Sequence, residues 1–188
     1  MNLPNKLTLG RIIAVPFFIL AYMTEHFLLA LIIFALASLT DMLDGQIARK
    51  RNLITNFGKI MDPLADKVLV YSAFCLMVAD GEIPAWMLIV ILAREFVVAG
   101  VRTVAASEGL VIAADMAGKI KTVLQMIAVP LILIYKYLDP VLNSTPGVLY
   151  EFPGLMRLYG HIILWASLAM TIYSGAMYIV KNKEVFKG

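Results

Sequence analysis

Cysteine, histidine and charge are all scarce in this sequence. The chain of 188 residues has one cysteine, Cys75, and two histidines, His26 and His161. A single cysteine excludes an intrachain disulfide, and we expect Cys75 to be an inert residue packed in the core. The histidines lie too far apart in sequence to indicate a zinc site. Charged residues make up only 15% of the chain, against about 25% in an average soluble domain. The net charge of +3 is too weak to indicate binding to nucleic acid.

Hydrophobic residues dominate what is present, at 61% of the chain. They form apolar spans of the length that a membrane-spanning helix needs, about 20 residues. The sequence therefore predicts an all-α integral membrane protein that forms a single domain over residues 1–188. Its six predicted transmembrane helices cover residues 9–23, 27–46, 60–80, 84–103, 115–137 and 159–180.

The first residues predict a short interfacial helix. Leu3, Leu7 and Leu9 would face lipid from a helix over residues 1–8 that lies on the membrane surface. The alternative is a signal peptide, but no small-residue cleavage site follows the first apolar span.

Basic residues predict the orientation, because cytoplasmic loops carry an excess of Lys and Arg. On one predicted side the only basic residues are Lys136 and Arg157, and several acids lie there as well. The other side has Lys6, Arg11, Lys50, Arg51, Lys59, Arg102, Lys119, Lys121, Lys181, Lys183 and Lys187. We therefore expect a multi-pass protein of the plasma membrane with both termini in the cytoplasm.

Four aspartates interrupt the apolar pattern at the cytoplasmic ends of the second and third spans. A charge at the centre of a membrane helix costs about 2.5–3.5 kcal/mol, so such residues usually serve a function. The spacing places each pair on one face of its helix, and a bound divalent metal would relieve the repulsion between the acids. The pattern is Asp41-x-x-Asp44-Gly45-x-x-Ala48-Arg49, eight residues, then Gly58-x-x-x-Asp62-x-x-x-Asp66.

Carboxylate oxygens suit hard cations such as magnesium, manganese or calcium. Four acids are enough to hold two ions about 4 Å apart, an arrangement that stabilises phosphoryl transfer. The small residues Gly45, Ala48 and Gly58 would let a substrate approach the backbone, and Arg49 could bind a diphosphate. One acid, with Asp66 as the candidate, could accept a proton from an attacking hydroxyl if the metals leave an oxygen free.

This pattern resembles the signature of the CDP-alcohol phosphatidyltransferases, with all eight signature positions filled. A six-helix chain of this length and the start Pro4-Asn5-x-Leu7-Thr8-x-x-Arg11 are also typical of the family members that use glycerol 3-phosphate. The resemblance implies transfer of a phosphatidyl group from CDP-diacylglycerol to an alcohol, with release of CMP. It also implies a homodimer.

The resemblance further implies a role for each signature residue. Asp41, Asp44 and Asp62 would bind Mg²⁺ or Mn²⁺, as two ions. Asp66 would be the general base and could also contact a metal. The residues that would line the CDP site are Gly45, Ala48, Arg49 and Gly58.

The acceptor is predicted from buried cations. Four basic residues in the cytoplasmic half would suit an anionic acceptor, and glycerol 3-phosphate is our prediction: Arg94, Arg102, Lys119 and Lys121. Alternatively, these side chains extend to the interface or set the topology, and Glu95 pairs with one of them. Asn5 and Thr8, with Arg11, could contact the CDP-lipid phosphates, or they could form an interfacial cap.

Two groups of alternatives remain. The same chemistry could use serine, inositol or its phosphate, or a second phosphatidylglycerol. A cation-coupled transporter also places acids in membrane helices. However, these acids lie on two adjacent helices near one side, and no inverted repeat is visible.

Overall fold

The computed structural model describes residues 3–51, 56–107, 109, 112, 115–143 and 151–183, while the side chains of residues 3–7, 41–51, 56–63, 66 and 143 lie outside this description. The described residues form an all-helical structure, as predicted. Its six helices are α1 (Leu3–Met23), α2 (Phe27–Arg51), α3 (Asn56–Ala79), α4 (Ala85–Ser107), α5 (Met116–Asn143) and α6 (Glu151–Lys181).

The N-terminal segment differs from its prediction, because α1 runs without a break from Leu3 to Met23. The prediction of a separate short helix over residues 1–8 is therefore wrong. Pro4 lies in the first helical turn, where its missing N–H costs no hydrogen bond. Gly10 lowers the stability of the helix by only about 1 kcal/mol relative to alanine. This loss is too small to end a helix of this length.

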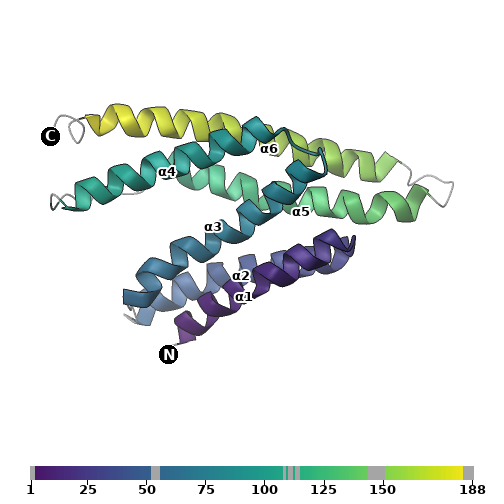
Figure 1. Cartoon of the computed structure of the whole chain (residues 1–188), viewed down its shortest axis with the longest axis horizontal. Coiled ribbons are helices and arrows are strands. Elements are labelled where there is room, and N and C mark those ends of the chain that lie inside the picture. The colour runs from purple at the N-terminus through teal and green to yellow at the C-terminus, as the bar shows by residue number, and fades with distance from the viewer. Residues whose placement is uncertain are drawn as a thin grey trace.

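Tight turns reverse the chain between neighbouring helices. Glu25 has a φ of 60° between α1 and α2, and Gly81 has a φ of 71° between α3 and α4. Glycine adopts this left-handed conformation without steric cost, so Gly81 suits its turn. The successive helices consequently run in alternating directions, and the N- and C-terminal ends lie at the same end of the molecule (Figure 1).

The helices form two groups joined by an oblique one. α1 packs against α2, while α6 packs against both α4 and α5. α3 runs obliquely between the two groups (Figure 1) and contacts α1, α4 and α5, and α2 packs directly against α5 as well. The main core lies where these groups meet, around the fully buried side chains of Phe18, Phe34, Phe74, Met77 and Met87.

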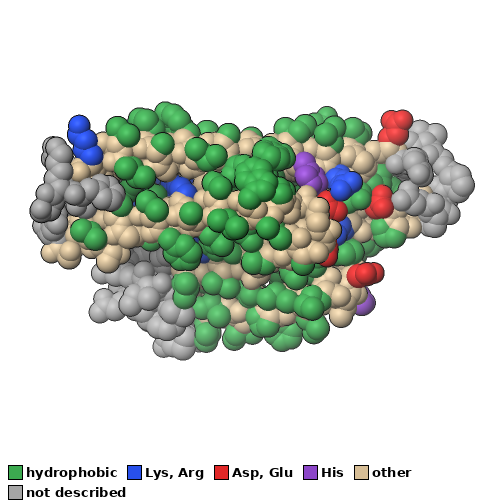
Figure 2. Space-filling view, turned by 45° about the horizontal axis from the view of Figure 1, so that its top comes forward, with side chains coloured by type: hydrophobic (Ala, Val, Ile, Leu, Met, Phe, Trp, Pro, Cys, Tyr) green, Lys and Arg blue, Asp and Glu red, His purple; other side chains and the backbone are tan. Residues whose placement is uncertain are grey.

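Large hydrophobic side chains also cover the outer surface (Figure 2). Phe96, Ile89 and Leu20 are 60–72% exposed, which suits contact with lipid. Cys75 is exposed as well, so its predicted place in the core is wrong.

Among the described residues, two segments are long and apolar enough to span a membrane, Met116–Leu142 and Glu151–Lys181. Shorter apolar helices cover Thr8–Met23, Phe27–Thr40 and Lys67–Ala79. The helices are therefore consistent with a membrane protein, although they do not establish six spans.

Ion pairs join the turns at the end opposite the termini, where acidic and basic side chains meet in Figure 2. Lys136 Nζ lies 2.7 Å from Asp80, and Tyr22 donates a hydrogen bond to the same carboxylate. Glu82 is largely buried and accepts from Arg157 at 3.2 Å. This group connects α1, α5 and α6 to the turn between α3 and α4, far from the aspartate motif.

Candidate active site

The two halves of the aspartate motif lie on consecutive helices. The backbone of α2 carries Asp41 and Asp44 near its C-terminal end, and that of α3 carries Asp62 and Asp66 in its N-terminal half. α2 and α3 contact each other, and these parts of the two helices meet at the end that holds the chain termini (Figure 1). The predicted helical placement of the motif is thus confirmed at the level of the backbone.

The side chains of the motif lie outside the described residues. This applies to the four aspartates and to Gly45, Ala48, Arg49 and Gly58. Among the side chains that are described, no group of three or more His, Cys, Asp or Glu residues could hold a metal. The metal-binding role of the aspartates therefore stays a prediction.

Thr8 and Arg11 lie inside the bundle. Thr8 is fully buried and Arg11 is 3% exposed on α1, which packs against α2 and α3. An interfacial cap would leave these side chains at the surface, so burial disfavours that alternative. The side chain of Asn5 lies outside the described residues.

A cavity of about 480 Å³ gathers all four cations that were predicted to bind the acceptor. Its walls come from α3, α4 and α5. The charged residues that line it are Lys67, Arg94, Glu95, Arg102, Asp115, Lys119 and Lys121. We refer to this cavity as the cationic pocket. Five cations face two carboxylates, so the pocket has an excess of positive charge that suits an anionic ligand.

Glu95 lies at the centre of the ion pairs in the cationic pocket. One carboxylate oxygen accepts from Arg94 at 2.7 Å and from Lys121, while the other lies 3.1 Å from Lys67 Nζ. The expectation that Glu95 pairs with one of the predicted cations is therefore confirmed, and it pairs with two of them. All of these groups except Lys67 are largely buried.

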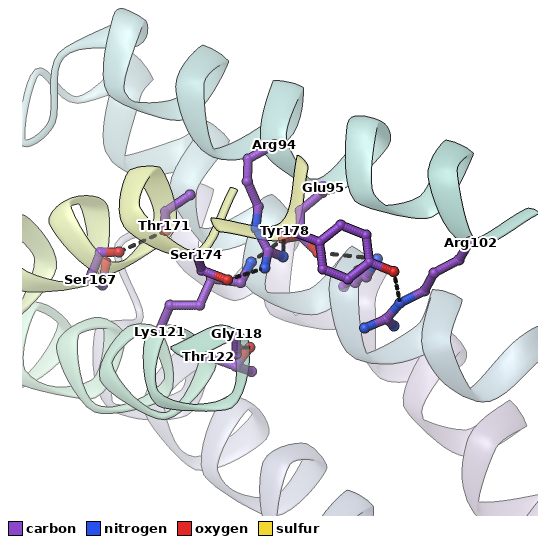
Figure 3. Close-up of polar contacts among 11 residues, drawn as sticks. Arg94, Glu95, Arg102, Gly118, Lys121, Thr122, Ser167, Thr171, Ser174 and Tyr178 are labelled. Carbon is purple, nitrogen blue, oxygen red and sulfur yellow. Dashed lines mark hydrogen bonds and ion pairs between the residues drawn. The ribbon is translucent and has the colours of Figure 1, made fainter. Parts of the chain in front are cut away.

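Side chains of α6 complete the arrangement (Figure 3). Arg94 donates a hydrogen bond to Ser174 at 2.5 Å. Arg102 donates to the hydroxyl of Tyr178 at 3.1 Å, and its guanidinium lies 5.5 Å from the centre of that ring. These contacts attach both arginines of α4 to α6. Arg94 is largely buried there, but Arg102 is exposed, and so is Lys119. The expected burial of the four cations is therefore confirmed for Arg94 and Lys121 and wrong for the other two.

Two glycines make room for Arg94. A Cβ atom added at Gly118 on α5 would lie 3.1 Å from Arg94 Nη2, and one added at Gly175 on α6 would lie 2.9 Å from Arg94 Cγ. Both approaches are closer than ordinary van der Waals contacts, so a side chain at either position would displace the arginine. The glycines therefore determine where the guanidinium lies.

Three residues of this arrangement were not predicted from the sequence as site residues: Lys67, Ser174 and Tyr178. A signal for two of them was present, because Ser167, Thr171, Ser174 and Tyr178 recur at helical spacing in an otherwise apolar segment. All four are buried. A polar stripe on a membrane-type helix indicates a face that meets other helices.

Comparisons with known proteins place the chain in a family. The profile of the CDP-alcohol phosphatidyltransferase family matches residues 1–173. Three similar proteins share the name CDP-diacylglycerol–glycerol-3-phosphate 3-phosphatidyltransferase. The one from Bacillus subtilis (strain 168) is 42% identical over 99% of this chain and 97% of its own length.

The other two relatives are more distant but also match along nearly their whole length. The protein from Rickettsia felis is 36% identical over 98% of this chain and 97% of its own length. The protein from Haemophilus influenzae is 33% identical over 100% of this chain and 94% of its own length. On this similarity, and with every signature position filled, the chain belongs to the CDP-alcohol phosphatidyltransferase family.

Proposed function

We propose that this chain transfers the phosphatidyl group of CDP-diacylglycerol to glycerol 3-phosphate, which yields phosphatidylglycerophosphate and CMP. The observation that carries this choice of acceptor is the cationic pocket, which collects five basic side chains beside the helix of Asp62 and Asp66. The names of the relatives that match nearly the full chain support the same acceptor.

The aspartates would hold the divalent metal. Their placement on consecutive helices at one end of the molecule suits a shared site, and a donor set of carboxylates alone suits Mg²⁺ or Mn²⁺. Asp41, Asp44, Asp62 and Asp66 would bind two ions. When bound, the ions would neutralise the diphosphate and stabilise the charge that develops on the departing CMP.

The protein side chains would then orient both substrates. Gly45, Ala48 and Gly58 would leave room for the CDP group, and Arg49, Asn5 and Thr8 would bind its phosphates.

The acceptor would be held and activated by two different sets of groups. The cationic pocket would bind the phosphate of glycerol 3-phosphate through Arg94, Arg102, Lys119 and Lys121. Asp66 would take the proton of the acceptor hydroxyl as its oxygen bonds to the phosphatidyl phosphorus. The diphosphate bond to CMP breaks, and the bonding electrons leave with CMP.

A membrane setting explains how the donor lipid reaches these groups. We propose a single domain over residues 1–188 with six transmembrane helices in the plasma membrane, and an active site that faces the cytoplasm. The exposed apolar side chains and the distribution of basic residues support this arrangement. CDP-diacylglycerol would then enter laterally while its acyl chains stay in the bilayer. We also propose a homodimer, as the family resemblance implies.

The experiment measures CMP release by purified protein in the presence of CDP-diacylglycerol and Mg²⁺ or Mn²⁺. Each reaction contains glycerol 3-phosphate, serine, inositol, inositol phosphate or phosphatidylglycerol. We expect release with glycerol 3-phosphate and none after chelation of the metal. Release with another alcohol but not with glycerol 3-phosphate would exclude the proposed acceptor and retain the family chemistry.

A further inference from the structure

Glu95 is placed as no other described acid is, because it binds cations from three helices. Its own helix, α4, supplies Arg94, while Lys67 comes from α3 and Lys121 from α5. Arg94 in turn donates to Ser174 of α6 (Figure 3). The Glu95 side chain is 10% exposed, so water screens its contacts with the buried Arg94 and Lys121 little. One side chain thereby connects four helices around the cationic pocket.

The three cations that contact Glu95 would repel one another without it. They converge on one carboxylate at hydrogen-bond distance, and Arg94 and Lys121 are largely buried there while Lys67 is 42% exposed. Like charges this close are unfavourable unless an acid lies among them. Glu95 therefore keeps Lys67, Arg94 and Lys121 at defined places while the pocket holds no anion.

Lys67 connects this group of ion pairs to α3, the helix that carries the second half of the aspartate motif. It follows Asp66 directly on α3, and its ammonium lies 3.1 Å from Glu95. The ion pair therefore determines the distance between the N-terminal half of α3 and the cations of α4 and α5. A small change in that distance would alter the angle at which an acceptor hydroxyl meets the diphosphate.

We infer that Glu95 is a positioning residue, which orders the cations of the cationic pocket so that the acceptor phosphate binds in one reactive orientation. This inference rests on the proposed function. Glu95 carries the same charge as the acceptor phosphate, so it does not attract that group. Its contribution is to hold the cations that do.

Charge and position make opposite contributions to anion binding, and this allows the inference to be tested. Replacing Glu95 by glutamine removes a negative charge from the pocket, so an unoriented anion should bind at least as tightly as before. The cations would no longer be held together, so turnover should fall. A residue that served only general stability would produce no such opposite changes.

The experiment compares wild type with Glu95→Gln, Glu95→Asp and a control, Glu82→Gln. Glu82 is a largely buried carboxylate that accepts a hydrogen bond from Arg157 and lies 3.9 Å from Lys136 Nζ, at the end of the molecule opposite the termini. For each protein, kcat and both KM values are measured by CMP release. The inhibition constant of inorganic phosphate against glycerol 3-phosphate is measured as well, and size-exclusion chromatography and thermal unfolding check the fold.

We expect Glu95→Gln to lower kcat by about ten-fold or more, with an inhibition constant for phosphate that is equal or lower. Glu95→Asp keeps the charge on a shorter side chain, so its kcat should lie between those of wild type and Glu95→Gln. Glu82→Gln should keep kcat and both KM values within about two-fold, because Glu82 lies in the turn between α3 and α4 and shares no described ion-pair partner with Glu95.

Three results would overturn the inference. The first is wild-type kcat in both Glu95 variants, and the second is an equal loss of kcat in Glu82→Gln. The third is weaker phosphate binding with unchanged kcat. If Glu95→Gln does not fold, the kcat of Glu95→Asp decides between the two roles. A wild-type kcat in that variant would exclude a requirement for a carboxylate at the full length of the glutamate side chain. Release of CMP by wild type with another alcohol alone would contradict the proposed acceptor, and the kcat values with that alcohol would still decide the role of Glu95.

Discussion

At the scale of single residues, ionised side chains in an apolar protein indicate where chemistry takes place. The four aspartates stand out in the sequence because a charge in a membrane helix is costly without a partner. Arg94 and Lys121 stand out for the same reason, and both lie against Glu95. The two groups differ in what balances their charge. The cations lie against a carboxylate of the protein, whereas we propose that the acids bind metal ions.

We expect Asp41→Asn and Asp62→Asn each to abolish turnover and weaken metal binding, because an amide oxygen without a charge is a poor ligand for Mg²⁺. CMP release and Mn²⁺ binding by the purified variants test this. Both variants should insert into membranes as wild type does. Full activity in either variant would contradict the metal-binding role.

Arg94→Ala should raise the KM for the acceptor by about ten-fold or more, because one charged hydrogen bond to a phosphate contributes about 1.5–3 kcal/mol. The KM for CDP-diacylglycerol should change much less. Ser174→Ala is the matched control, because it removes the partner of Arg94 but keeps its charge, and it should have the smaller effect. An unchanged acceptor KM in Arg94→Ala would remove this residue from the phosphate site.

At the scale of helices, the packing of α6 against both α4 and α5 determines where Arg94 lies. Gly118 and Gly175 come from different helices and both face this side chain. Neither helix could approach the arginine as closely with a larger residue at these positions. The cationic pocket therefore depends on how three helices pack and not on α4 alone.

Gly175→Ala should raise the acceptor KM several-fold, because its new methyl group would lie 2.9 Å from Arg94 Cγ and displace the guanidinium. Gly160→Ala on the same helix is the control. Its methyl group would lie 2.8 Å from Ile132, so it should lower the unfolding temperature with little change in acceptor KM. Equal acceptor KM values in the two variants would show that α6 does not control Arg94.

At the scale of the whole molecule, alternating helix directions bring separate parts of the chain to one end. The C-terminal end of α2 and the N-terminal end of α3 meet there, and so do the ends of α4 and α5 (Figure 1). The lipid donor and the soluble acceptor could therefore meet on one side of a membrane. The proposed orientation places this side in the cytoplasm.

Labelling of the two ends of α6 tests that orientation. In a Cys75→Ser background, Glu151→Cys and Lys181→Cys place single thiols at opposite ends of this helix, and both positions are exposed. A maleimide that does not cross membranes should label Glu151→Cys on intact cells but Lys181→Cys only after lysis. The reverse pattern would contradict a cytoplasmic active site.

The sequence was sufficient for the features that depend on local patterns. Hydrophobic spans and tight turns predicted an all-helical chain with six helices, and the aspartate spacing predicted which helices carry the motif. The prediction of a separate helix over residues 1–8 was wrong, because neither Pro4 nor Gly10 ends a helix there. Cys75 was placed in the core because its span is apolar, but composition alone does not show which face of an apolar helix is buried.

The sequence by itself determined the family, the candidate metal ligands and the set of cations that line one pocket, because each depends on residue type and spacing along the chain. Only the tertiary structure decided that Lys67, Arg94 and Lys121 share one carboxylate, and that Ser174 and Gly175 of α6 position the arginine. The contact between Arg94 and Ser174 joins residues 80 positions apart. These contacts depend on how tightly helices pack, which helical periodicity within one segment does not contain.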